Sequence, residues 1–140
     1  MKNIYKKKTI VFLNTKLNNI DYKNIFNNLS YSLNGIKRIC LHKSEKSKLH
    51  IMILQTKRGF RFPKHSHLDT NEFLFILKGK LELTIYNSHN IKKTVLFGNS
   101  KDMSLIKKGV PHSTNPLTDK CIYLEVKNGP YNRQKIKFYN

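Results

Sequence analysis

Two short stretches of the sequence contain four side chains that commonly bind metal ions. His65 and His67 lie two residues apart within GFRFPKHSHLDTNEFLFILKG, residues 59–79, and Glu72 follows five residues after His67. His112 comes directly after the sequence KKGVP. Three imidazoles and one carboxylate suit Zn, Fe(II), Mn, Ni, Co or Cu, and leave coordination positions for water or substrate. The residue types therefore predict one divalent metal ion per chain without selecting the element.

The local geometry of the first stretch is compatible with such a site. Side chains alternate along a β-strand, so His65 and His67 point to the same face if their segment is extended. The sequence LDTN that follows is long enough for a turn that returns Glu72 to the histidines. A His-x-His pair by itself is more often a pair of surface or structural histidines, so the interpretation depends on the spacing of the whole set.

The apolar pattern after residue 35 is typical of short β-strands separated by polar turns. Seven or eight such strands indicate an all-β sandwich or barrel. Residues 103–116, which include His112, are expected to form a short strand followed by a turn. The expected full strands lie within residues 36–42, 49–56, 59–67, 72–78, 80–87, 91–97 and 120–127.

The N-terminal part of the chain has a different pattern. DYKNIFNNLSYSLNG, residues 21–35, predicts a short helix with Asp21 as its N-cap and Gly35 as its stop signal. The apolar face of this helix is expected to hold Ile25, Phe26, Leu29 and Leu33. We therefore expect an N-terminal arm over residues 1–35, with a short helix and an extended segment, and a barrel domain over residues 36–140.

Composition limits the class of protein. A chain of 140 residues fits one domain, and no window is apolar enough to span a membrane. The short apolar run near the N-terminus does not fit a signal peptide, so we expect a cytoplasmic protein. Cys40 and Cys121 do not form a disulfide framework and are expected to be buried thiols.

The net charge of +19 raises the question of nucleic-acid binding. Only four of the 27 basic residues are Arg, and the Lys residues are spread over the whole chain. Nucleic-acid recognition favours clustered Arg, so this composition argues against that function. Attraction to small anionic ligands, such as nucleotide-linked sugars, remains compatible with the charge.

The spacing of the first stretch resembles the first sequence motif of the cupin superfamily. Gly59, His65, His67, Glu72 and Gly79 occupy every defined position of that motif. The resemblance implies a single jelly-roll barrel, also described as a double-stranded β-helix, with the metal ligands facing into its mouth.

The second cupin motif is only partly kept in KKGVPHSTNP, residues 107–116. Gly109 and His112 stand at the expected offset, whereas Lys107 replaces the usual proline and Asn115 stands one residue early. These differences concern the turn and leave the ligand set intact.

Three further segments are similar to the WbuC family of cupin-fold metalloproteins. They are RICLH at residues 38–42, LHIMIL at residues 49–54 and EVKNGPY at residues 125–131, and the resemblance covers residues 36–133. Members are encoded among genes for O-antigen and other surface polysaccharides. The resemblance therefore implies a sugar or sugar-nucleotide ligand in polysaccharide biosynthesis, but it implies no particular reaction.

In a barrel of this kind, the two faces of the strand that begins at Glu72 have different environments. The inward row is expected to be Glu72, Leu74 and Ile76, and the outward row Phe73, Phe75 and Leu77. Because the outward row is also apolar, it should be covered by the second sheet, the N-terminal segment or another subunit. Together with the family analogy, this predicts a homodimer.

Other polar residues are candidates for ligand binding. Arg38 shares a strand face with His42, and an Arg that faces the barrel mouth can bind a phosphate or carboxylate through two hydrogen bonds; the alternative is a surface Arg beside a structural histidine. His50 begins the next strand. Glu125 either faces outward or is a buried partner for Arg or Lys, and a catalytic acid–base role is the third alternative. Tyr131 either reaches a ligand or caps the barrel.

Two classes of function fit these residues. The first is a metal-dependent enzyme that acts on a sugar or sugar nucleotide, by isomerisation or epimerisation next to a carbonyl or, with Fe(II), as a dioxygenase. The second is a non-catalytic module that uses the metal to bind a small anionic ligand. The sequence leaves both open.

Overall fold

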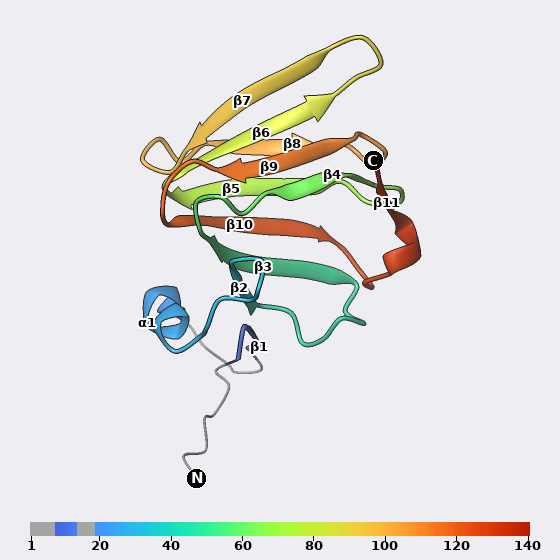
Figure 1. Cartoon of the computed structure of the whole chain (residues 1–140). Coiled ribbons are helices and arrows are strands. Elements are labelled where there is room, and N and C mark those ends of the chain that lie inside the picture. Colours follow the sequence, from blue (N-terminus) through green and yellow to red (C-terminus); the bar gives the residue numbers. More distant parts are fainter. Residues whose placement is uncertain (1–7, 14–18) are drawn as a thin grey trace.

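Two β-sheets that face each other form the body of the protein (Figure 1). The computed structural model describes residues 8–13 and 19–140. The six-stranded sheet has the strand order β1-β2-β3-β10-β5-β8, and the five-stranded sheet has the order β11-β4-β9-β6-β7. Neighbouring strands are antiparallel except β1 and β2, which are parallel. This arrangement confirms the predicted all-β class.

The elements of the six-stranded sheet are β1 (Ile10–Phe12), β2 (Ile36–Cys40), β3 (Leu49–Thr56), β5 (Glu72–Lys78), β8 (Met103–Ile106) and β10 (Cys121–Asn128). Those of the five-stranded sheet are β4 (Phe62–His67), β6 (Lys80–Tyr86), β7 (Ile91–Phe97), β9 (His112–Pro116) and β11 (Ile136–Phe138). The helices are α1 (Tyr22–Asn27) and a short 3₁₀ helix, η1 (Arg133–Lys135).

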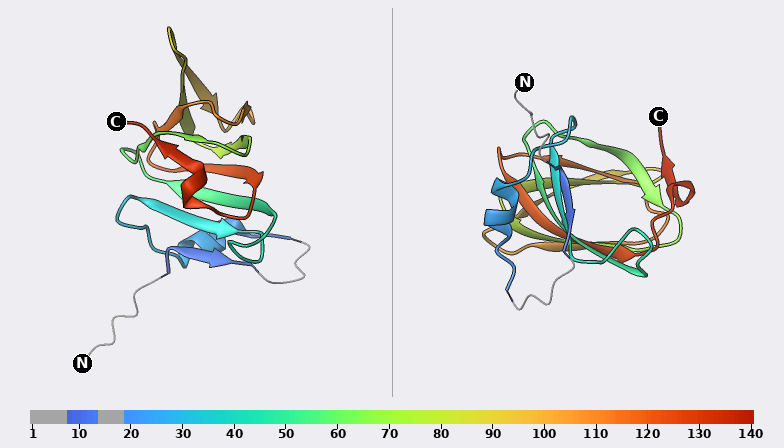
Figure 2. Two further views of the ribbon diagram at one scale, coloured as in Figure 1. Left: turned by 90° about the vertical axis from the view of Figure 1, so that its right-hand side faces the viewer. Right: turned by 90° about the horizontal axis from the view of Figure 1, so that it is seen from below.

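Helix α1 and the β6–β7 hairpin lie at opposite ends of the molecule (Figure 2). Helix α1 lies beside β2 on the outside of the six-stranded sheet, and β1 lies at the same end of the molecule (Figure 1). Among the described residues, no helix has the length and apolar character needed to cross a membrane. The division into an arm and a barrel domain at residue 35 stays a prediction, although β1 of the arm pairs with β2 of the barrel.

Apolar side chains fill two regions on opposite faces of the six-stranded sheet. The core between the sheets includes Leu54, Leu74, Ile76, Leu81 and Tyr123, all nearly or completely buried. A second core lies under α1 and includes Phe26, Leu29, Ile39, Ile53 and Ile122. Successive side chains of a strand point to opposite faces of the sheet, so neighbouring residues pack into different regions, as the sequence predicts.

The N-terminal helix is shorter than predicted. Asp21 is its N-cap, as expected, and its carboxylate accepts a hydrogen bond of 3.1 Å from the N–H of Asn24. The helix ends at Asn27, and the predicted placement of Leu33 on its buried face is wrong because that side chain is fully exposed. Residues 32–36 form a separate turn, in which the N–H of Gly35 donates to the carbonyl of Ser32.

Three strands in the structure were not predicted by the apolar pattern. Strand β9 has the polar sequence HSTNP, and β1 and β11 have only three residues each. β9 lies between β4 and β6, so its backbone hydrogen bonds are made with two neighbours. Its conformation is therefore set by tertiary pairing, which overrides a weak local preference.

The outward row of β5 is covered only in part. Leu77 packs against the core under α1, whereas Phe73 and Phe75 are half-buried. Their cross-strand neighbours on β8 are Leu105 and Met103, whose side chains are more than half exposed. An apolar surface therefore remains on the outer face of the six-stranded sheet.

The packing of α1 gives a direct test of the fold. Phe26 is 1% exposed, so Phe26→Ala should lower the free energy of unfolding by about 3–5 kcal/mol, the usual cost of removing a buried aromatic ring. Leu33→Ala is the control and should change it by less than about 0.5 kcal/mol. Urea unfolding of both variants measures the difference, and equal effects would contradict the packing of the helix.

Candidate metal centre

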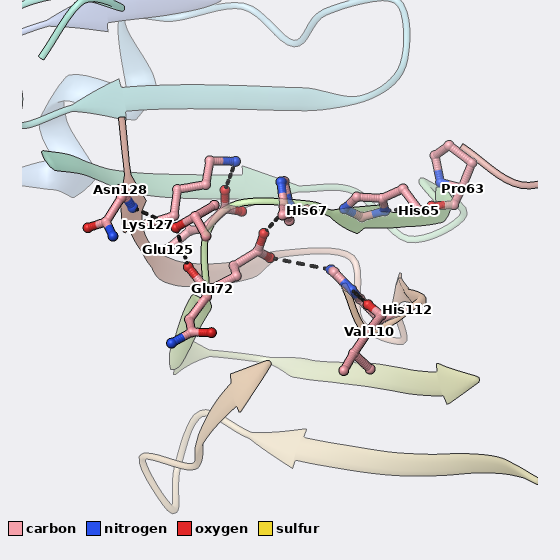
Figure 3. Close-up of polar contacts among 11 residues, drawn as sticks. Pro63, His65, His67, Glu72, Val110, His112, Glu125, Lys127 and Asn128 are labelled. Carbon is pink, nitrogen blue, oxygen red and sulfur yellow. Dashed lines mark hydrogen bonds and ion pairs between the residues drawn. The ribbon is translucent and has the colours of Figure 1, made fainter. Parts of the chain in front are cut away.

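The four side chains singled out in the sequence meet at one place between the sheets (Figure 3). His65, His67, Glu72 and His112 are all buried, and one potential ligand atom from each lies within 4.8 Å of the others. The histidines come from β4 and β9 of the five-stranded sheet, and the glutamate is the first residue of β5 in the six-stranded sheet. Such an arrangement can hold one metal ion.

Strand register places these side chains. His65 and His112 are direct cross-strand partners in the β4–β9 pair, and His67 follows on the same face of β4. The turn after β4 then carries the chain to the opposite sheet, so Glu72 approaches from the other side. The site therefore joins the two sheets and depends on three strands.

The turn that precedes His112 is tied to the end of β4. The N–H of Gly109 donates to the carbonyl of His67 over 2.6 Å, and the N–H of Lys108 donates to the side chain of Asn71 over 2.9 Å. Gly109 has a φ of +78°, a left-handed conformation that a side chain disfavours. A glycine at this position thus allows the turn conformation that places His112 in the site.

Backbone hydrogen bonds fix the orientation of two imidazoles. Nδ1 of His65 donates to the carbonyl of Pro63 over 2.8 Å, and Nδ1 of His112 donates to the carbonyl of Val110 over 2.9 Å. A neutral imidazole carries one N–H, so in that state these bonds leave the Nε2 lone pair of both rings available. Metal-binding histidines are commonly held in this way.

The electrostatics of the site centre on Glu72. Its two carboxylate oxygens lie 2.6 Å from Nε2 of His67 and 3.8 Å from Nε2 of His112. Burial by itself raises the pKa of the Glu72 carboxyl, but the contacts with His112 and His67 hold it well below its usual value. The carboxylate is therefore ionised at neutral pH.

The histidines respond to this charge in different ways. Burial, with a contribution from the charge of His112, lowers the pKa of His65 to about 4. Burial also lowers the pKa of His112, but the nearby Glu72 carboxylate raises it above its usual value. His65 is therefore a neutral imidazole at neutral pH.

The hydrogen bonding of two buried nitrogens shows whether these residues fit a metal. Nε2 of His67 and Nε2 of His112 are buried and have no hydrogen bond of acceptable geometry within the described part of the chain. A buried polar atom without a partner costs about 1–3 kcal/mol, so it is rare unless a bound group supplies the missing interaction. A divalent cation beside the ionised Glu72 would do so, and the donor set fits that ion.

A cavity of about 390 Å³ extends from three of the four residues, His65, His67 and Glu72, along the inner face of the six-stranded sheet. Arg38, His50, Glu125 and Tyr131, the predicted ligand-binding residues, all line it. Arg38 is on β2 and shares the inward face with His42, as predicted, while Tyr131 is at the exposed rim. The structure thus brings these side chains to one cavity, and their roles stay predictions.

The sequence interpretation missed Lys127, which lies in the cavity two residues after Glu125. Its Nζ is 2.9 Å from Oε1 of Glu125, so Glu125 is the partner of a basic side chain (Figure 3). Burial lowers the pKa of Lys127, but Glu125 and Glu72 raise it above its usual value, so the amine is charged. The alternation Tyr123–Glu125–Lys127 in the last long strand is the signal that could have identified it.

Two further histidines that line the cavity, His42 and His50, are held by the protein itself. The rings of His42 and His50 stack with 4.1 Å between their centroids. His42 Nδ1 accepts a hydrogen bond from the N–H of Ile51, and Nε2 of His50 donates to the carbonyl of Glu45. These contacts hold both buried rings in place in the cavity wall, and ligand binding by His50 stays a prediction.

Comparisons with known proteins agree with this architecture. The sequence matches no known family profile. It is 40% identical over 63 residues to quercetin 2,3-dioxygenase of Bacillus subtilis strain 168, across 45% of this chain and 17% of the dioxygenase. The fold is similar to a cupin-2 domain protein from Shewanella frigidimarina, with a TM-score of 0.60 and 16% identity over 79% of this chain and 94% of that protein. This chain has the cupin fold.

A second structural neighbour has a name that refers to polysaccharides. The capsular polysaccharide assembling protein CapF from Staphylococcus aureus gives a TM-score of 0.63 and 16% identity, over 75% of this chain and 30% of CapF. This chain spans only a minor part of the length of CapF and of the dioxygenase. These similarities support the resemblance to the cupin superfamily.

The two cysteines of this cupin give a test of its interior. Burial raises the pKa of Cys121 to about 12 and that of Cys40 to about 11, so both are protonated at pH 8. The thiolate is the reactive form, and we expect Ellman's reagent to modify neither cysteine in the native protein and both after unfolding in urea. Rapid modification of the native protein would contradict the placement of these strands.

Proposed function

We propose that this chain is a metal-binding cupin of the WbuC type, with one divalent ion held by His65, His67, Glu72 and His112. The observation that carries the proposal is the convergence of four buried potential ligand atoms, each within 4.8 Å of the others, around an ionised carboxylate. Two of the histidines are also oriented by backbone carbonyls, as metal ligands commonly are.

We further propose that the protein is a metal-dependent enzyme acting on a sugar or sugar nucleotide in surface polysaccharide biosynthesis, such as an isomerase, an epimerase or an oxygenase. A divalent ion at this site would supply Lewis-acid polarisation of a carbonyl or hydroxyl oxygen, or oxygen chemistry if the ion is iron. The WbuC resemblance and the name of the structural neighbour CapF support the polysaccharide context.

The protein's own residues would bind the ligand and transfer protons to or from it. Arg38 faces the cavity and can bind an anionic group, and apolar side chains such as Leu74 exclude water from the interior. Glu125 and Lys127 form a carboxylate–ammonium pair in the same cavity. The Glu125 carboxylate is a candidate general base, and the charged Lys127 can bind a negatively charged oxygen of the ligand.

A non-catalytic binding module is the second candidate, because the same contacts would hold a ligand without turnover. Incubating the metal-loaded protein with candidate sugars and sugar nucleotides separates the two. An enzyme must form product, which mass spectrometry or NMR detects, whereas a binding module raises the melting temperature and leaves the ligand unchanged.

The metal site can be tested residue by residue. His65→Ala and His67→Ala should each reduce bound metal from about one ion per chain to less than about a tenth of that, because loss of a ligand weakens a four-ligand site strongly. His89→Ala, in an exposed turn, is the matched control and should retain full metal content. Elemental analysis of untagged protein gives the ratio, and full metal in the two site variants would refute the assignment.

We also propose that the protein is a cytoplasmic homodimer. The buried free thiols of Cys40 and Cys121 are compatible with a reducing compartment. The exposed apolar side chains Met103 and Leu105 flank Phe73 and Phe75 on the outer sheet face and carry no charge, so two copies can meet there despite a net charge of +19 on each.

This interface predicts a change of mass in solution. The unmodified protein should have twice the 16.5 kDa mass of one chain in light scattering coupled to gel filtration. Leu105→Lys should shift it to the monomer because it places a charge in the apolar contact. Ile91→Lys, which alters an exposed apolar residue on β7, is the control. The same mass for both variants would contradict this choice of interface.

A further inference from the structure

We propose that the cavity binds a monosaccharide-sized anion at two points, with an oxygen at the metal centre and a carboxylate or phosphate at Arg38. This inference rests on the proposed metal site and narrows its ligand to a sugar acid or sugar phosphate, which suits the volume of the cavity better than a nucleotide-linked sugar does. The argument has three parts, which are the state of Arg38, the charge balance of the cavity and its dimensions.

Arg38 is the one cationic side chain of the cavity wall that lacks a partner within the described residues. It is half-buried on the inner face of β2, and it has neither an ion pair nor a hydrogen bond there. Its cross-strand neighbours are the apolar residues Leu54 and Ile10. A guanidinium that is partly removed from water requires a counter-charge, and its planar donors match a carboxylate or phosphate.

The other cations of the wall are already engaged. Lys127 pairs with Glu125 over 2.9 Å. The guanidinium of Arg133 lies over the ring of Phe138, 4.8 Å from its centroid, at the exposed rim. Both groups therefore have local contacts that stabilise them, and Arg38 is left as the group that a ligand can satisfy.

The formal charges of the cavity lining also favour an anion. The lining contains three basic and three acidic side chains, counting the histidines as neutral: Arg38, Lys127, Arg133, Glu45, Glu72 and Glu125. These charges cancel. A divalent ion at the metal centre would leave the cavity with two positive charges, and a ligand with one or two negative charges balances them.

The dimensions set the size of the ligand. Glu72 is on β5 and Arg38 is on β2, with β10 and β3 between them, so three strand spacings separate them by about 14 Å across the sheet. The register places Ile76, four residues after Glu72, level with Arg38. This offset adds about 13 Å along the strands, so the two backbone positions are roughly 19 Å apart. Both side chains extend into the cavity and shorten the gap. The volume of about 390 Å³ is near the lower end of the roughly 300–1,000 Å³ found for small-molecule pockets. A single sugar ring with one anionic group suits this space better than a nucleotide-linked sugar.

Calorimetric titration of the metal-loaded full-length protein tests the inference. The probes are glucuronate, glucose 6-phosphate, neutral glucose and UDP-glucose. We expect at least one of the two monosaccharide anions to bind more tightly than glucose and UDP-glucose, and the stronger of the two identifies the anionic group. Arg38→Gln should weaken that binding by about 10-fold to 100-fold, as expected for the loss of hydrogen bonds to a charged group.

Matched variants make the result specific. Arg58→Gln removes an exposed guanidinium that pairs with Asp119 outside the cavity, and it should leave the affinities unchanged. Arg38→Gln should keep full metal content and the same melting temperature without ligand, which separates a lost contact from a damaged fold. Arg38→Lys retains the positive charge and should therefore recover part of the affinity lost in Arg38→Gln. The recovery should be incomplete, because a lysine cannot form the paired hydrogen bonds of a guanidinium.

The possible failures are distinguishable. Protein without stoichiometric metal would refute the proposed function. Metal-loaded protein would overturn the present inference alone if it binds none of the four probes, if it binds glucose or UDP-glucose as tightly as both monosaccharide anions, or if Arg38→Gln and Arg58→Gln have the same effect.

Discussion

The buried carboxylate of Glu72 is the constraint on which the rest of the site depends. An ionised group that is only 4% exposed is costly unless opposite charge or hydrogen-bond donors surround it. Here its neighbours are imidazoles, two of which are turned by backbone carbonyls so that their other nitrogens are left for the site. A cation held by the four residues would balance this charge and would also satisfy the two buried nitrogens that have no hydrogen bond of acceptable geometry within the described residues.

The barrel holds this arrangement by joining its two sheets at one point. The turn after β4 crosses from one sheet to the other and is pinned at both sides: the N–H of Leu68 donates to the carbonyl of Lys135, and the hydroxyl of Thr70 accepts from the N–H of Asn128. The ligands are therefore borne by strands whose ends are fixed, and the cavity opens beside them. Its polar wall comes from β2, β3 and β10, so the candidate metal centre and the predicted ligand-binding residues belong to one interior.

The sequence predicts much of this because the relevant signals are local. Two-residue alternation places His65 with His67 and Arg38 with His42, and the spacing of the glycines indicates the barrel turns. Gly79 illustrates this, because its φ is +83° and an added Cβ would meet the carbonyl of Lys120. These predictions need no knowledge of distant contacts.

Long-range contacts determine what the sequence does not show. The polar strand β9 and the short strands β1 and β11 form because neighbouring strands supply their hydrogen bonds. Lys127 looks like a surface lysine until its pairing with Glu125 is known. Leu33 follows the helical spacing of Phe26, but the chain turns after Asn27 and leaves it in solvent. In each case tertiary structure overrides a local preference.

Anomalous diffraction from crystals of the metal-loaded protein tests the central claim most directly. The account predicts a single strong peak per chain, about 2.0–2.2 Å from a nitrogen of each of His65, His67 and His112 and from a carboxylate oxygen of Glu72. A peak at another place, or an ion held without Glu72, would contradict it.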